Sequence, residues 1–233
     1  MIRLLTLVTI ASLLTGITSC NKAPVGNNAP TISISSPADN LIMNSSGTLT
    51  LTVLATDTDG AIDKVEFFNG SSLLGTSFSP FTFILVNPPA GSYKITAKAT
   101  DNRGAVTTSA AINVTVNIAF TATLNGANER PNPVASAATG SSIASYNVST
   151  KILSITTNYT GLTPTAGHLH TGAPNVSGPV TFGFPAPLTS PIVFNTPVLT
   201  ATQESDLLQN LYYVNLHTPA FPGGEIRGQL IKQ

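Results

Sequence analysis

The chain has 233 residues, which is enough for one large domain or for two domains of ordinary size. Hydrophobic residues make up 42% of the sequence and charged residues only 9%, which argues against a helical protein, because helices place many charged residues on their solvated faces. The formal net charge is zero and no run of like charges occurs, so the sequence lacks the basic patch that a nucleic-acid-binding protein needs.

The first twenty residues, MIRLLTLVTIASLLTGITSC, have the layout of a secretory signal. Arg3 precedes an apolar run from Leu4 to about Ile17, which is too short to span a bilayer comfortably. The closing residues ITSC resemble the lipobox of bacterial lipoproteins, and this resemblance implies that Cys20, the only cysteine, carries a lipid. The alternative is an ordinary signal peptide followed by a free cysteine.

The lipobox has consequences for location. Residues 21–30, NKAPVGNNAP, are expected to form a flexible polar tether between the lipid and the folded part. The sequence therefore predicts a protein that crosses the inner membrane and is held by its lipid in the bacterial cell envelope, at the outer membrane.

Residues 31–117 alternate apolar and polar side chains with the period of two that is typical of strands. Turn signals rich in Gly, Pro, Asn and Asp separate the strand segments. About seven short strands in ninety residues predict an antiparallel sandwich. The predicted strands include TISIS, TLTLTVLA, KVEFF, FTFILV, YKITAKA and AINVTV.

Two stretches of this segment, ATDTDGAIDKVEFFNGSSLLG and GSYKITAKATDNRGAVTTS, resemble bacterial immunoglobulin-like domains. The resemblance implies a spacer or adhesion module. Four aspartates in its turns, Asp57, Asp59, Asp63 and Asp101, are expected at one end of the sandwich, where their carboxylates can share a calcium ion. The alternative is that Asp serves here only as a turn former.

Residues 119–233 have longer strands and proline-rich loops. AFTATLNG is predicted to be a strand, and GSSIASYNVSTKILSITTNYTGL a hairpin that turns near STK. ATQESDLLQNL, from Ala201, is the one convincing helix, with Thr202 as its expected cap. The overall prediction is an all-β protein of two antiparallel sandwich-like domains in tandem, the second with one short helix.

Three stretches of the second domain, LNGANERPNPVASAATGSS, AGHLHTGAPNVSGPV and YYVNLHTPAFPGGEIRGQL, resemble the chordin-type CHRD domain from about Phe120 to Leu230. The resemblance implies the identity of the domain, but its bacterial members lend no agreed activity.

All three histidines of the chain lie in these stretches. In HLH the apolar Leu169 is expected to face the core, so His168 and His170 share the opposite face. In YYVNLHT, His217 follows an inward Leu216 and therefore also faces away from the core. If the two strands are neighbours, the three imidazoles gather on one polar face.

Further polar residues are predicted on the same face. In GEIRGQL, Ile226 points inward, which leaves Glu225 and Arg227 on the outer face. If the last two strands form a hairpin, His217 lies near Glu225, and Asn215 lies near Arg227.

Two interpretations of this face follow from the residues. Histidines at i and i+2 of a strand, with a third from a neighbour, can converge on zinc or copper. The H-x-H strand is similar to the copper-binding strand of copper–zinc superoxide dismutase, although that enzyme's remaining histidines and zinc-site aspartate have no counterparts here. The other interpretation is a hydrogen-bonded network that fixes strand register, with Glu225 and Arg227 paired.

No enzyme is predicted, because the sequence has no G-x-S-x-G elbow, no phosphate loop and no cysteine beyond the proposed lipid site. The leading hypothesis is a non-enzymatic binding or adhesion module, with an unidentified protein or glycan ligand, displayed on an immunoglobulin-like stalk. The alternatives are a zinc or copper protein that uses the three histidines, and a purely structural spacer of the envelope.

Overall fold

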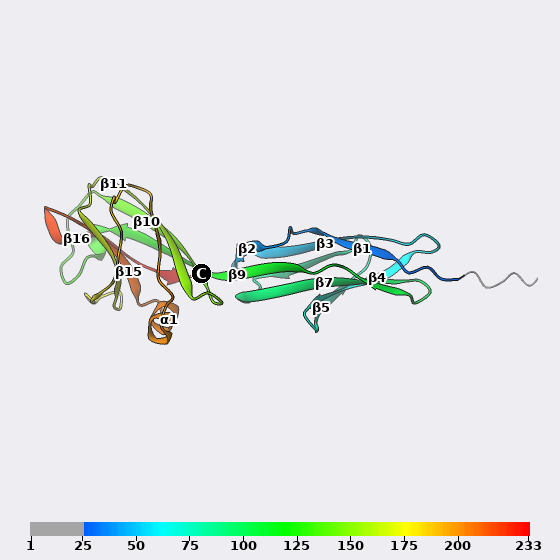
Figure 1. The fold of residues 1–233 in the computed structure, drawn as a ribbon. Coiled ribbons are helices and arrows are strands. Elements are labelled where there is room, and N and C mark those ends of the chain that lie inside the picture. Colours follow the sequence, from blue (N-terminus) through cyan, green and yellow to red (C-terminus); the bar gives the residue numbers. More distant parts are fainter. Residues whose placement is uncertain (1–25) are drawn as a thin grey trace, which may run out of the picture.

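The computed structural model describes residues 26–233, so the predicted signal peptide, Cys20 and the first half of the predicted tether lie outside the described residues. The described residues form two β-sandwiches, which lie end to end in Figure 1 and are joined through the strand β9. The expected all-β architecture with one short helix is confirmed. Among residues 26–233, no helix is long and apolar enough to cross a membrane.

The first sandwich packs a sheet of three strands against a sheet built around β7. Alternation along TLTLTVLAT places Leu49, Leu51 and Val53 in the core, where they are at most 3% exposed. The first sheet has the order β1 (Thr31–Ser36), β3 (Thr48–Thr56), β6 (Thr82–Val86). The second contains β2 (Leu41–Asn44), β4 (Ile62–Asn69), β5 (Ser72–Ser77), β7 (Gly91–Asp101), β8 (Val106–Thr108) and the first half of β9 (Ile112–Asn125).

The six strands predicted for this sandwich are all present, but three further strands, β2, β5 and β8, escaped prediction. They have only four, six and three residues. Segments this short lie beside Gly, Asn and Ser residues, so their period-two signal is lost among turn signals.

The strand β9 belongs to both sandwiches. Its 14 residues run without a break from Ile112 to Asn125. The first half pairs with β2 and β7, and the second half pairs with β10 and with the end of the chain. AINVTV and AFTATLNG, predicted as two strands of separate domains, are therefore one strand.

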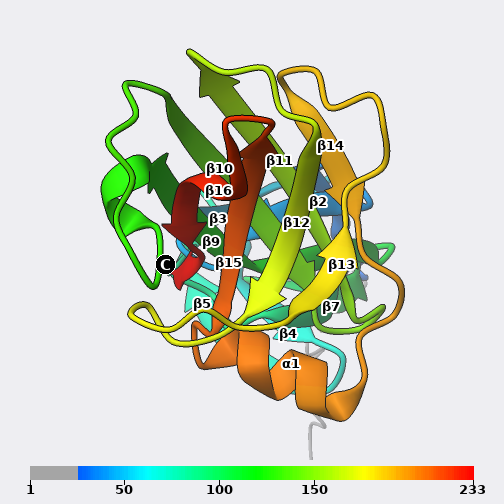
Figure 2. The same cartoon turned by 90° about the vertical axis from the view of Figure 1, so that its left-hand side faces the viewer.

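The second sandwich is one continuous sheet that folds over on itself. The strand order is β13-β12-β15-β16-β9-β10-β11-β14, with β17 beside β9. In Figure 2, β12, β13 and β15 lie in front of β9, β10 and β11, and α1 crosses one end. The bounds are β10 (Thr139–Asn147), β11 (Ile152–Thr160), β12 (Ala166–Thr171), β13 (Val180–Gly183), β14 (Ile192–Asn195), β15 (Tyr212–Thr218), β16 (Phe221–Gln229) and β17 (Ile231–Lys232), with a short 3-10 helix at Gly126–Asn128.

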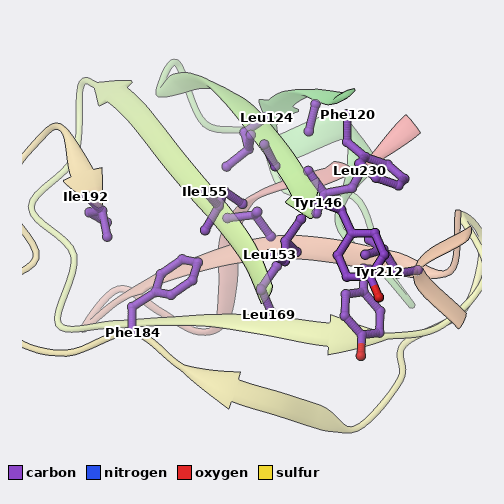
Figure 3. Packing of buried hydrophobic residues seen from close by; sticks show 14 of the residues in the cluster. Phe120, Leu124, Tyr146, Leu153, Ile155, Leu169, Phe184, Ile192, Tyr212 and Leu230 are labelled. Atoms are coloured by element: carbon purple, nitrogen blue, oxygen red, sulfur yellow. The ribbon is translucent and has the colours of Figure 1, made fainter. Parts of the chain in front are cut away.

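The core between the two layers is apolar and closed, as Figure 3 shows for the side chains around Leu153 and Ile155. Leu169 of β12 is fully buried in this core, as the alternation of HLH predicts. Burying a leucine contributes about 1.5–3 kcal/mol, so this one residue helps to hold the flanking histidines on the opposite face of the sheet.

The helix α1 (Ala201–Leu208) begins at Ala201, as predicted, but its cap differs from the predicted one. Its cap is Thr200, whose hydroxyl accepts the N–H of Gln203 while the Gln203 side chain accepts the N–H of Thr200. This reciprocal pair is a capping box. The predicted cap, Thr202, is wrong because Thr202 already lies inside the helix.

Candidate metal centre

The three histidines lie together on the side of the second sandwich that faces away from its core. The strands β12 and β15 are antiparallel neighbours, with Ala166 opposite His217 and His168 opposite Asn215. The diagonal of this register brings Nδ1 of His168 to 3.1 Å from Nε2 of His217. His170 completes the group, since one ring nitrogen of each histidine lies within 4.8 Å of the other two.

Two backbone carbonyls decide which nitrogen of two of these rings is protonated. Nδ1 of His170 lies 3.0 Å from the carbonyl oxygen of Gly178, and Nδ1 of His217 lies 3.1 Å from that of Pro222. A carbonyl only accepts hydrogen bonds, so both Nδ1 atoms carry the proton and both Nε2 atoms keep a lone pair. Nε2 of His170 is buried and has no hydrogen-bond partner.

All three imidazoles favour the neutral form. Burial lowers the pKa of His168, His170 and His217 from 6.5. For His170, the positive charge of Arg227 and the neighbouring ring of His168 lower the pKa further, against the opposing effect of the hydrogen bond to Gly178. The neutral imidazole is the form that binds a metal ion.

A tyrosine and an arginine fix the orientation of His170. The ring of Tyr213 stacks on His170 at a centroid distance of 4.9 Å and an interplanar angle of 10°. The hydroxyl of Tyr213 accepts the N–H of Gly178, the residue whose carbonyl binds His170. The guanidinium carbon of Arg227 lies 3.5 Å from the Tyr213 ring centroid.

Three residues of the polar face are buried, whereas strand alternation predicted that they point outward. Asn215, Glu225 and Arg227 are only 5%, 7% and 2% exposed. They do lie on the non-core face, but the loops at 126–136 and 172–179 fold over them. Sequence alternation shows which side of a sheet a residue occupies. It gives no information on the loops that cover that side.

Of the predicted pairs, Asn215 with Arg227 is confirmed, and Glu225 with Arg227 is wrong. Asn215 does lie opposite Arg227 in the hairpin of β15 and β16. Glu225 instead accepts hydrogen bonds from Ser136 and Thr218, and among the described residues it forms no ion pair with Arg227.

Glu129 is a site residue that sequence reasoning missed. It is 3% exposed, and one of its oxygens accepts a hydrogen bond from the side-chain amide of Asn215. Burial raises the pKa of Glu129 to about 7. The only feature of the sequence that could have indicated Glu129 is its position as an acidic residue in a segment with few charges. The carbonyls of Gly178 and Pro222 belong to the backbone, so no side chain could have indicated their role.

The four aspartates of the first sandwich are not gathered in the same way. Asp59 forms an ion pair with Arg103 at 2.8 Å, and Asp101 accepts the backbone N–H groups of Arg103 and Ala105. Asp63 is exposed on β4. Within residues 26–233, the three histidines are the only group of three or more His, Cys, Asp or Glu side chains close enough to hold a metal ion. Asp57 is therefore outside any such group too.

Comparisons with solved structures return β-rich modules of low similarity. Fibronectin(III)-like modules of Clostridium thermocellum CbhA are 23% identical, with 37% of this chain and 94% of that chain covered and a TM-score of 0.35. A carbohydrate-binding module of the β-sandwich superfamily is 15% identical, with coverages of 89% and 94% and a TM-score of 0.33. The protein SGBP-B of Bacteroides ovatus, solved with a mixed-linkage heptasaccharide, is 12% identical, with coverages of 87% and 67% and a TM-score of 0.30.

Family comparisons are more specific. No curated protein matches the sequence. Residues 30–97 match the bacterial Ig domain, and residues 120–230 match the CHRD domain, which contains all three histidines. The chain therefore contains a bacterial Ig domain followed by a CHRD domain.

Proposed function

We propose that this protein binds a transition-metal ion, zinc or copper, through His168, His170 and His217 of its CHRD domain. The observation that carries the proposal is the convergence of one ring nitrogen from each histidine within 4.8 Å, together with the buried Nε2 of His170, which has no hydrogen-bond partner. A buried lone pair without a partner costs free energy, and a metal ion bound there removes that cost.

The donor set fits such an ion. Metal–nitrogen bonds of about 2.0–2.1 Å place tetrahedral ligand atoms roughly 3.3 Å apart. The separation of 3.1 Å between Nδ1 of His168 and Nε2 of His217 is already close to this value, and one ring nitrogen from each of the three histidines lies within 4.8 Å of the other two. In His170 and His217, Nδ1 donates a hydrogen bond to a backbone carbonyl. Metal-binding histidines generally have such a partner on their second ring nitrogen, and it fixes the orientation of the ring.

Three protein ligands leave a coordination position for solvent or for a further ligand. His168 and His217 are partly exposed, so this position is within reach of molecules outside the protein. Metal binding gives the CHRD domain the role of a non-enzymatic binding module. Through Cys20, which we propose to be lipidated, the domain would be displayed in the cell envelope with the Ig domain as its spacer.

The test uses mature protein expressed without a histidine tag, whose zinc and copper contents are measured by mass spectrometry and whose affinities are measured by titration. We expect one equivalent of zinc or copper per chain, and loss of binding in the variant H168A/H170A/H217A. The control is Asp59→Asn, which removes a carboxylate from the first sandwich and should leave metal binding unchanged. Equal metal content in wild type and triple variant would overturn the proposal and leave the hydrogen-bonded network as the role of these histidines.

A further inference from the structure

Two of the three arginines between residues 26 and 233 have no carboxylate partner. Arg103 pairs with Asp59 at 2.8 Å, but within this part of the chain neither Arg130 nor Arg227 forms an ion pair. Arg227 is nevertheless only 2% exposed. A buried charge normally has a counter-charge, because desolvation of an isolated ion is expensive.

The hydrogen bonds of both guanidinium groups go to neutral oxygens. Arg227 donates to the carbonyls of Ala173 and Val176 and to the side chain of Gln229. Arg130 donates to the carbonyls of residues 127 and 129 and to the side chain of Asn175. These acceptors hold the two groups in place but carry no negative charge to offset theirs.

The two charges also lie close enough to affect each other. Burial is the main cause that lowers the pKa of Arg227, and the charge of Arg130 lowers it further, while Tyr213 and Glu129 oppose the shift. The carboxyl group of Glu129 is beyond ion-pair distance of both arginines and is itself largely uncharged below a pH of about 7.

A pocket of about 230 Å³ lies between these groups. It opens beside Pro174 and Asn175, which are exposed residues of the loop after β12. Its lining contains no acidic side chain and consists of Asn128, Arg130, Pro174, Asn175, Arg227 and Gln229. Two guanidinium groups and three side-chain amides therefore face one small polar cavity.

We infer that this pocket binds a small oxyanion, that is, a phosphate, sulfate or carboxylate group. A guanidinium group presents its N–H donors as a planar fork that matches two oxygens of such an anion. The volume exceeds that of one tetrahedral oxyanion, and the bound anion would supply the missing counter-charge. The pocket contains none of the three histidines, although Arg227 also contacts Tyr213 beside His170, and the test is made without metal ions, so it is independent of the metal proposal.

The experiment follows the side-chain N–H signals of the arginines and of Asn175 by NMR during titration of the mature protein with sodium phosphate, sodium sulfate or sodium glucuronate. Sodium chloride keeps the ionic strength constant, and EDTA removes metal ions. We expect saturable shifts with at least one of the three probes. Saturation by phosphate or sulfate alone identifies an inorganic anion, and saturation by glucuronate identifies an acidic sugar or another carboxylate; either result supports the oxyanion site.

Two variants and one control make the assignment specific. Arg130→Gln should weaken binding about tenfold, as expected for the loss of one charge-assisted hydrogen bond. Asn175→Asp, an exposed change that places a carboxylate beside Arg130, should weaken it at least as much. Arg103→Gln removes the same charge from the first sandwich and should change nothing. Shifts that never saturate, or equal affinities in Arg130→Gln and Arg103→Gln, would overturn the inference.

Discussion

Nδ1 of His168 lies 3.1 Å from Nε2 of His217, although 49 residues separate the two histidines in the sequence. Their approach is a consequence of the antiparallel register of β12 and β15, which places Ala166 opposite His217. A diagonal pair of this kind faces the same side of the sheet. The register that the two strands adopt is therefore also what assembles the candidate metal centre.

Gly178 is expected to be essential for this centre. A Cβ atom at this position would collide with the carbonyl oxygen of Thr171, and Gly178 itself provides the carbonyl that binds His170. Gly178→Ala should destabilise the protein by about 1–3 kcal/mol and weaken metal binding. Thermal unfolding and metal titration measure the two effects. Gly223→Ala, where a Cβ meets nothing within 4 Å, is the matched control and should leave both unchanged.

Glu129 should make the protein less stable at high pH. Burial raises its pKa from 4.5 to about 7, so the folded state favours the protonated carboxyl. The contribution to stability is fully present below pH 4.5 and is lost as the pH rises through about 7, with a magnitude of about 3 kcal/mol. The three histidines, whose pKa values are lowered, have the opposite pH dependence, so the Glu129 effect is measured as a difference: by chemical denaturation, the stability of wild type relative to Glu129→Gln should be lower at pH 9 than at pH 5.

Glu66 provides a contrast with the opposite sign. Hydrogen bonds from Lys98 and Lys64 hold the pKa of Glu66 below its usual value, so its contribution is present at neutral pH and is lost as the pH falls. In Glu66→Gln the change in stability between pH 5 and pH 9 should therefore stay close to that of wild type. If Glu129→Gln has the same pH dependence as wild type, Glu129 is not the group that titrates.

Cys20 is expected to carry a lipid. Cys20→Ala should release the protein from the membrane fraction or block its processing, because a single modified residue provides the anchor. Cell fractionation and mass spectrometry of the mature amino terminus measure the outcome. Soluble wild-type protein with an unmodified Cys20 would contradict this prediction.

The two domains are expected to fold separately, although they share β9. Residues 30–117 contain one complete apolar core, and residues 119–233 contain every buried residue of the other except Ile118, with no buried residue common to both. Each half of β9 keeps its own pairing partners in these fragments. Both should give dispersed amide spectra when expressed alone, and collapse of both spectra would show that the halves of β9 depend on each other.

Strand alternation was sufficient to predict which side of the sheet each histidine occupies, because Leu169 and Leu216 are apolar residues that have to be buried. It was also sufficient for the hairpin of β10 and β11. The burial of Arg227 was not predictable in this way, because it depends on carbonyl groups of a distant loop, and every residue has a carbonyl. The same reason hid the contacts of His170 and His217 with Gly178 and Pro222.

The side chains of β9 alternate between the two faces of the strand without interruption from one sandwich to the other. Val114 and Val116 enter the first core, and Phe120 and Leu124 enter the second, all at even positions of one strand. Inserting one residue after Val116 would leave each half of β9 in phase with its own partners, and it would turn the second sandwich by about half a turn around β9 relative to the first. A flexible linker absorbs an added residue, whereas this continuous strand converts it into a change of orientation. The number of residues in β9 therefore sets how the CHRD domain is oriented relative to the Ig domain.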